Sequence, residues 1–225
     1  MMKVVISLGG SLLTRELTPE NFARYAEVLR RLRRRGHRLV VVCGGGRTAR
    51  VYQRLVKELG GDEELQDLVG IEATHMNAMT LIAALGEDAH PRSLRTVEEV
   101  VENFGDRIIV CGGDKPGCST DYDAALFAEA LRADLLVNAT DVDGVYTADP
   151  KRDPNAVKLN RLTYDRFEEI LSKNVQAPGE YGLFDLKAVD VLRRSGVRLV
   201  VVDGRDPEEI IRAVEGGHRG SEVYG

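Results

Sequence analysis

The stretch "LVVVCGGGRTAR" (residues 39–50) decides the fold of this chain. A run of apolar, mostly β-branched residues stops at three glycines, and Arg47 and Arg50 follow directly. Such a run is typical of a strand that is buried on both faces of a parallel sheet. Glycine allows a turn at positive φ and lets a ligand approach the backbone closely. The stretch therefore predicts a buried strand that ends in an anion-binding turn.

Four more apolar runs of the same type occur along the chain, and helical patterns lie between them. The runs are 3–8, 107–112, 133–140 and 197–203. The helical patterns cover 19–35, 47–59, 64–86, 95–104, 122–132, 164–173, 185–195 and 207–214. This alternation predicts an α/β fold with a mostly parallel open sheet and helices on both faces. We expect one domain over residues 1–225, with two lobes that meet near residue 150 and share the sheet.

Composition narrows the function. The chain has 31 basic and 36 acidic residues and a net charge of −5, which argues against a broad nucleic-acid surface. Its three cysteines match no zinc pattern and fit a reduced, cytoplasmic protein. No signal peptide is recognised at the start, and no apolar run is expected to reach membrane-spanning length.

Three glycine clusters fall where predicted strands end: "LGGS" (8–11), "CGGGR" (43–47) and "CGGDKPGCSTD" (111–121). In open α/β sheets, ligands bind beyond the carboxyl ends of the strands. A tight strand-to-helix connection explains any one cluster, whereas three in one domain predict a shared anion pocket. None of them has the dinucleotide-binding or P-loop pattern, and the protein-kinase motif set is absent.

Four segments together resemble the amino-acid kinase superfamily. They are "VVISLGGSLL", "VVVCGGGRTAR", "STDYDAALFAEALRADLLVNATDVDGVYTADPKRDPNA" and "LFDLKAVDVLRRSGVRLVVVDG". Within the superfamily the chain is most similar to the archaeal type of uridylate (UMP) kinase, from residue 3 to about residue 222. The resemblance implies transfer of the ATP γ-phosphate to UMP, in pyrimidine nucleotide synthesis. It also implies a three-layer αβα sandwich of about eight strands, Mg²⁺ carried by ATP with no metal site of the protein's own, and a homohexamer built from dimers.

The resemblance also assigns roles to residues. Arg50, Lys115 and Asp121 would be catalytic. Residues 1–150 would form the phosphate-acceptor side and residues 151–225 the ATP side. ATP would be bound by Ser7, Leu8, Gly9, Gly10, Ser11, Gly46, Arg50, Thr140, Tyr146 and Asp149, and UMP by Gly45, Asp67, Lys115, Pro116, Gly117, Cys118, Ser119, Thr120 and Asp121.

Several of these residues also have simpler explanations. Thr120 or Asp121 could be the N-cap of the helix predicted at 122–132. Asp67 could be an exposed helix acid, and Asp149, which precedes a proline, could serve only a turn. Tyr146 could be a packing residue.

The expected chemistry needs no general base, because the acceptor is a phosphate oxygen that is already anionic. The protein has to hold two polyanions in line and offset their repulsion with Mg²⁺, backbone N–H groups and cations. Many members of the superfamily carry Lys where this chain has Ser7. Mg²⁺, Arg47, Arg50 or Lys115 must then supply the positive charge at the γ-phosphate.

Other functions remain open from sequence. An isopentenyl phosphate kinase would be expected to carry a His near the glycine clusters, and none is found there. An acetylglutamate kinase would be longer. A nucleotide- or anion-binding protein of the same fold, without useful turnover, is a third alternative.

Overall fold

The computed structural model describes residues 1–150, 152–174 and 183–225. Its main sheet has seven strands in the order β3-β2-β1-β4-β8-β9-β7, and β5 and β6 pair with each other apart from it. The strands are β1 (Lys3–Leu8), β2 (Arg38–Cys43), β3 (Ile109–Cys111), β4 (Leu135–Thr140), β5 (Val145–Tyr146), β6 (Lys158–Leu159), β7 (Arg161–Thr163), β8 (Arg198–Asp203) and β9 (Ser221–Tyr224).

The centre of the sheet is parallel. β1 lies between β2 and β4, so that Ser7 is paired with Val42 on one side and Asn138 on the other. At the other edge, β9 runs antiparallel to its neighbour β8, and β7 runs parallel to β9. The mostly parallel sheet is confirmed, with seven strands rather than about eight. The edge strands β7 and β9 have three and four residues, too short to stand out as apolar runs.

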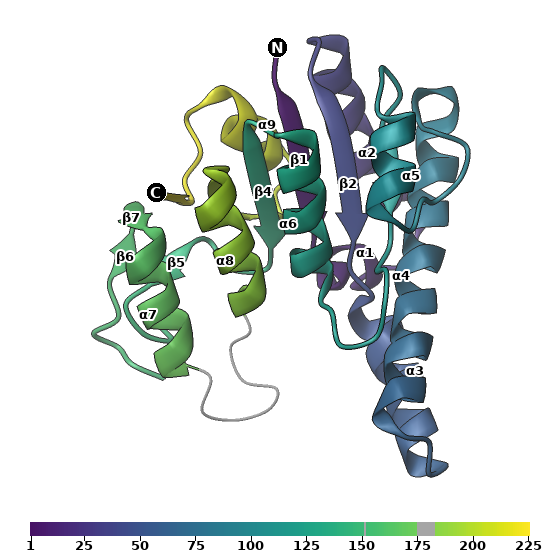
Figure 1. Cartoon of the computed structure of the whole chain (residues 1–225), viewed down its shortest axis with the longest axis horizontal. Helices are drawn as coiled ribbons and strands as arrows, with labels where there is room; N and C mark the ends of the chain where they lie inside the picture. Colours follow the sequence, from purple (N-terminus) through teal and green to yellow (C-terminus); the bar gives the residue numbers. More distant parts are fainter. Residues whose placement is uncertain (151, 175–182) are drawn as a thin grey trace.

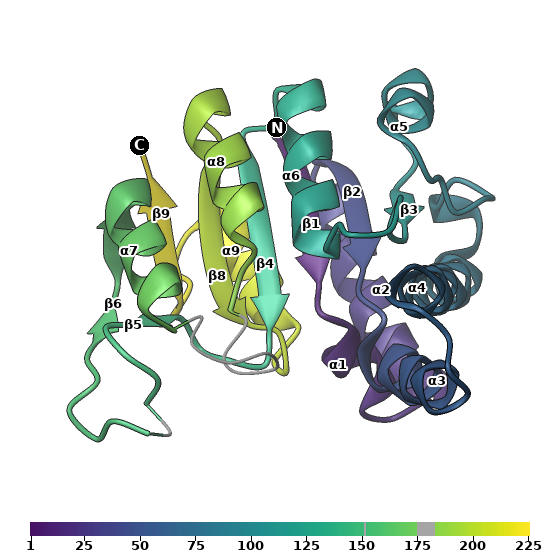
Figure 2. The ribbon, with the colours of Figure 1, turned by 60° about the horizontal axis from the view of Figure 1, so that its bottom comes forward.

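Helices cover both faces of the sheet, which gives the three layers that the sequence predicts (Figure 2). On one face α6 and α8 lie over β1 and β4, and α2 and α9 lie behind the sheet (Figure 1). The helices are α1 (Gly10–Thr14), α2 (Pro19–Arg34), α3 (Gly46–Glu58), α4 (Glu63–Leu85), η1 (Gly86–Asp88), α5 (Val97–Asn103), α6 (Thr120–Leu131), α7 (Tyr164–Asn174), α8 (Leu186–Ser195) and α9 (Glu208–Glu215).

Alternate strand residues feed two separate cores, as a sheet with two covered faces requires. Val5 and Val40 pack with α6 and α8 residues such as Phe127. Ile6 and Val41 pack on the other face with residues of α2, α4 and α9. All eight predicted helices are confirmed to within two residues at each end. The five-residue α1 was missed, because one turn of helix carries no periodic signal.

One helix corrects the expectation about membrane-spanning segments. Residues 63–88, which comprise α4 and η1, are long and apolar enough to cross a membrane by length and composition alone. Half of this apolar stretch is buried inside the protein, and α4 packs against α3, α2, β2 and β3. The apolar character of α4 therefore serves packing within the fold, at least along its buried half.

The turn after β1 and the turn after β2 are in direct contact. The Gly44 N–H donates to the carbonyl of Leu8 at 2.9 Å, and the Gly9 N–H donates to Ala139 at the same distance. A Cβ placed on Gly10 would lie 2.1 Å from the Gly46 nitrogen, and one on Gly46 would lie 2.2 Å from the Gly10 oxygen. The two glycine turns therefore pack backbone against backbone, with no space for side chains.

Gly10→Ala is expected to destabilise the protein by about 1–3 kcal/mol or more, since backbone cannot move aside as a flexible side chain would. The free energy of unfolding, measured by urea titration, tests this. Gly105→Ala is the matched control, because a Cβ there meets only the Asn103 carbonyl oxygen, at 3.9 Å. Equal stability of the two variants would contradict close contact between the turns.

Candidate active site

The first of two neighbouring cavities lies where α3 and α4 meet the turn after β3. This α3–α4 cavity has a volume of about 230 Å³. Its walls include Gly45 and Gly46 from one glycine turn and Gly113 from another. The third turn does not line this cavity, but its Gly10 packs against Gly46, so the three predicted turns lie in one region. The remaining lining residues are Ala49, Arg50, Gln53, Asp67, Gly70, Ile71, Thr74, Cys118 and Thr120.

Buried polar side chains of α4 hold two of these turns in place. The Asn77 amide donates to the Gly44 carbonyl at 2.7 Å, and the Gly113 N–H donates to the Thr74 hydroxyl at 2.7 Å. His75 contacts the Gly113 carbonyl through Nε2 at 2.9 Å and the Ser93 hydroxyl through Nδ1 at 2.7 Å. Burial lowers the pKa of His75 below its usual range, which favours the neutral ring. Because a carbonyl only accepts, Nε2 carries the proton and Ser93 donates to Nδ1.

Side chains of α4 and α8 both bind the loop between β3 and α6 through the backbone of Gly117. Asp67 accepts the Gly117 N–H at 2.8 Å, and the Lys187 ammonium donates to the Gly117 carbonyl at 3.3 Å. Asp67 is therefore engaged in the site rather than a free helix acid. Lys115 and Pro116 lie in the same loop but outside the residues that line the α3–α4 cavity.

Asp121 is held against the central strand. Its carboxylate accepts the Ser7 hydroxyl at 2.7 Å. Burial raises the pKa of Asp121 to about 6, and the negative charge of Asp185 adds to the shift against the effect of the Ser7 hydrogen bond. The cap of α6 is Ser119, whose hydroxyl accepts the Tyr122 N–H at 3.1 Å. The suggestion that Thr120 or Asp121 caps this helix was therefore wrong.

The second cavity, which we call the arginine cavity, has a volume of about 280 Å³ and lies beside the first. Arg50 lines both cavities and thus marks their junction. Thr14 joins the two turns here, since its hydroxyl donates to the Gly10 carbonyl and accepts the Arg47 N–H, each at 2.8 Å. The residues that line it are Ser11, Leu12, Thr14, Arg15, Arg47, Arg50, Asp141 and Arg205.

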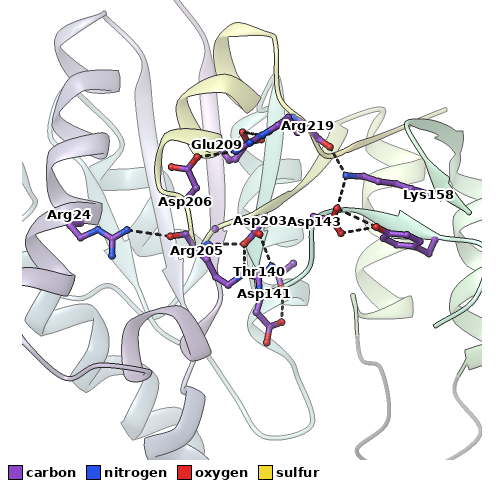
Figure 3. Close-up of polar contacts among 12 residues, drawn as sticks. Arg24, Thr140, Asp141, Asp143, Lys158, Asp203, Arg205, Asp206, Glu209 and Arg219 are labelled. Carbon is purple, nitrogen blue, oxygen red and sulfur yellow. Dashed lines mark hydrogen bonds and ion pairs between the residues drawn. The ribbon is translucent and has the colours of Figure 1, made fainter. Parts of the chain in front are cut away.

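Asp141, which follows β4, and Arg205, which follows β8, line the arginine cavity. Figure 3 shows their polar contacts. The Thr140 hydroxyl contacts the Asp141 carboxylate at 3.4 Å. Arg205 donates to the Asp203 carboxylate through Nε at 2.8 Å and Nη2 at 2.7 Å, and this contact lowers the pKa of Asp203. The charge of Arg205 is therefore largely compensated within the protein.

Tyr146 and Asp149 follow farther along, in and after β5. The Tyr146 hydroxyl donates to Asp143 at 3.0 Å. The Asp149 carbonyl accepts the N–H groups of Arg152 and Asp153 at 3.0 and 2.9 Å, so the turn suggested by the Asp-Pro pair is present. Asp141 lines the arginine cavity, whereas Thr140, Tyr146 and Asp149 are not among the residues that line it.

A larger cavity of about 510 Å³ lies away from the glycine turns, between α2 and α4. Apolar residues such as Leu17, Phe22 and Ala84 form most of its wall. It offers no charged side chain, which makes it a poor site for a nucleotide. The two smaller cavities are therefore the candidate active site.

Comparison with known proteins identifies the family. The profile of the amino acid kinase family matches residues 2–203. The chain belongs to the amino acid kinase family. It is 44% identical over 223 residues to the uridylate kinase of Hyperthermus butylicus, covering 99% of this chain and 98% of that protein. Identity to the uridylate kinase of Methanothermobacter thermautotrophicus is 42% over 216 residues, with 96% of each chain covered.

A solved structure agrees. The crystal structure of uridylate kinase from Archaeoglobus fulgidus superposes with a TM-score of 0.87 at 40% identity, covering 99% of this chain and 100% of that one. The resemblance to archaeal uridylate kinases that the motifs indicate is thus confirmed.

Some residues of the site were missed from sequence. Thr74, His75 and Asn77 sit within a helix and were given no role in the site, although three polar residues in an apolar helix are a usable signal. Asp185 caps α8 through the Lys187 N–H at 2.8 Å and also accepts the Ser119 hydroxyl, which only the fold brings near.

Asp121→Asn is expected to change stability in a pH-dependent way. A carboxyl whose folded pKa is raised from 3.8 to about 6 favours the folded state only while it is protonated, so this contribution is lost as pH rises through that window. The variant should match the wild type near pH 4 and exceed it above pH 6, by up to about 3 kcal/mol. Urea unfolding at a series of pH values measures the difference.

The exposed Asp106 provides the control. Its side chain is 89% exposed, so Asp106→Asn should leave the pH dependence of unfolding unchanged. A stability difference for Asp121→Asn that is the same at every pH would show that the charge of this carboxyl is not penalised by the fold.

Proposed function

We propose that the protein is a UMP kinase, which transfers the ATP γ-phosphate to UMP and releases ADP and UDP. The observation that carries the proposal is the pair of contiguous cavities that meet at Arg50 above touching glycine turns. Such an arrangement can hold two anionic ligands end to end. The archaeal relatives, which this chain matches along nearly their whole length, are named uridylate kinases. This supports UMP as the acceptor.

The acceptor nucleotide is assigned to the α3–α4 cavity. Gly45 and the 115–121 loop would enclose UMP, with Asp67 placed to bind the ribose hydroxyls. Asp67 already accepts the Gly117 N–H, so the same carboxylate would hold both the 115–121 loop and the UMP ribose. The Thr120 hydroxyl, which lines the cavity, is the candidate to read the uracil edge, where a donor opposite O4 would reject the amine of cytosine. The Ser119 hydroxyl, the other candidate from sequence, already donates to Asp185 and accepts the Tyr122 N–H.

The donor nucleotide is assigned to the arginine cavity and the strand ends beside it. Residues 7–11 and Gly46 would face the phosphates, and Thr140, Tyr146 and Asp149 would hold the adenosine. The division into an acceptor side (1–150) and an ATP side (151–225) stays a prediction.

Catalysis in this site is positioning and charge compensation. Backbone N–H groups of the turns, Arg50 and Lys115 would stabilise charge on the transferring phosphoryl group. Mg²⁺ in phosphoryl-transfer sites is held mainly by substrate phosphates and one or two carboxylates. Within the described ranges no three acidic, His or Cys side chains form a metal-binding group.

We further propose that the protein works in the cytoplasm, in pyrimidine nucleotide synthesis, as a homohexamer built from dimers. An apolar surface suited to self-association covers the outer side of α3 and α4, which run past the end of the sheet (Figure 1). Leu59 is 88% and Met79 54% exposed there. Further exposed apolar side chains on the two helices are Val51, Tyr52, Leu55, Leu65, Leu68 and Met76.

Turnover tests the main proposal. ADP release should be fast with UMP and slow with CMP, GMP and AMP. Arg50→Ala should lower kcat/KM by about 2–4 kcal/mol of transition-state stabilisation. Arg54→Ala on the same helix, exposed and outside both cavities, is the control and should keep wild-type kinetics.

The other outcomes separate the alternatives. Nucleotide binding without ADP release would point to a binding protein of the same fold. Turnover of acetylglutamate or isopentenyl phosphate in place of UMP would place the chain elsewhere in the family. An Arg50→Ala variant with unchanged kcat/KM would remove Arg50 from the reaction.

Oligomerisation is tested separately. Leu55→Asp combined with Leu68→Asp should break the hexamer into smaller species in sedimentation velocity, since charges would replace apolar contacts. Val101→Asp, an equally exposed apolar site on α5, should leave the assembly intact. A hexamer that survives the double substitution would rule out the α3–α4 surface as a subunit contact.

A further inference from the structure

Most arginines near the catalytic edge and along α2 are paired with carboxylates, and a few are not. The basic run that ends α2 is an example of pairing: Arg33 contacts Asp88 at 2.7 Å, and Arg30 contacts the same carboxylate at 3.0 Å. By contrast, within the part of the chain that the structure describes, Arg15, Arg47 and Arg50 have no carboxylate within ion-pair distance.

These three arginines converge on one place. All of them line the arginine cavity, although Arg15 follows α1 and the other two lie in the first turns of α3. The contact between the glycine turns brings the two elements together, and the Thr14 hydroxyl locks them through the Arg47 N–H at 2.8 Å. A protein with a net charge of −5 thus keeps uncompensated positive charge in one cavity.

The nearby acids offset only part of this charge. Asp141 is the one carboxylate among the residues that line the cavity, against the guanidinium groups of Arg15, Arg47 and Arg50. Asp203 is taken up by Arg205 through a two-pronged contact. An arrangement of unpaired guanidinium groups beside glycine backbone suits a ligand with several phosphate oxygens, because each guanidinium can donate two parallel hydrogen bonds.

Position 7 shows why these arginines are needed. Ser7 lies at the centre of the sheet and donates its hydroxyl to Asp121, so it brings no positive charge to the phosphates. The cations must come from the rim of the cavity instead. Arg50 lines both cavities, whereas Arg15 and Arg47 line the arginine cavity and not the α3–α4 cavity, which places them on the donor side.

We propose that Arg15, together with Arg47, binds the triphosphate of the donor nucleotide and supplies the positive charge that position 7 lacks. The role depends on the kinase function proposed above. Both side chains are exposed, so they can close over the phosphates when the donor arrives. Their contribution should weaken as salt screens it.

Calorimetric titration with inorganic tripolyphosphate, without UMP, gives a readout that is independent of turnover. Arg15→Gln should weaken tripolyphosphate binding about tenfold, and Arg15→Gln with Arg47→Gln about a hundredfold, as expected for lost charge-assisted hydrogen bonds. Arg15→Lys should retain part of the binding because it keeps the charge. Arg107→Gln, an exposed arginine before β3 and outside the cavities, should bind as the wild type does.

Steady-state kinetics give the second readout. KM for ATP should rise in parallel with the tripolyphosphate dissociation constant, whereas KM for UMP should change less than about twofold, because the arginines do not line the acceptor cavity. Unchanged tripolyphosphate affinity in the double variant, with thermal unfolding like that of the wild type, would overturn the inference. Equal rises in KM for both substrates would also overturn it.

The two proposals fail in different ways. If the wild type phosphorylates UMP and the double variant binds tripolyphosphate as tightly as the wild type, only the role of Arg15 and Arg47 is refuted. A wild-type protein that binds tripolyphosphate through these arginines but never phosphorylates UMP would refute the kinase function and support only an anion site.

Discussion

The site rests on one steric constraint, the contact between the turn after β1 and the turn after β2. Gly10 and Gly46 approach so closely that a single methyl group on either would overlap the backbone of the other. This contact places the start of α3 beside α1, and with it Arg47 and Arg50 beside Ser11. The cavities, their charge and their common border at Arg50 all depend on the absence of side chains at this point.

A second layer of polar contacts turns this constraint into a defined pocket. Thr74, His75 and Asn77 lie buried on α4, where unpaired polar groups would be costly, and each is satisfied by a glycine turn. One helix thereby sets the distance between the turn after β2 and the turn after β3. The same helix presents apolar residues on its outer side, so it connects the interior of the site with the surface proposed for subunit contact.

The arginines of the protein differ in whether a carboxylate neutralises them. The arginines at the end of α2 are neutralised by acids, and Arg205 is neutralised by Asp203. Within the described residues, Arg15, Arg47 and Arg50 have no carboxylate within ion-pair distance, and Asp121 accepts the Ser7 hydroxyl at the central strand. A site built to hold two polyanions needs this excess of positive charge, because backbone N–H groups alone would not offset their mutual repulsion.

The sequence alone determined the strands at the centre of the sheet, the eight longer helices and the glycine turns, because apolar periodicity and glycine clusters are local signals. The family could also be named from its motifs. What the tertiary structure decided was which distant residues meet: Ser7 with Asp121, Asp67 with Gly117, and Arg15 with Arg47. It also decided that Ser119, rather than Thr120 or Asp121, caps α6. Such pairings depend on strand order and on how helices pack across the sheet, and no local pattern in a single sequence records either.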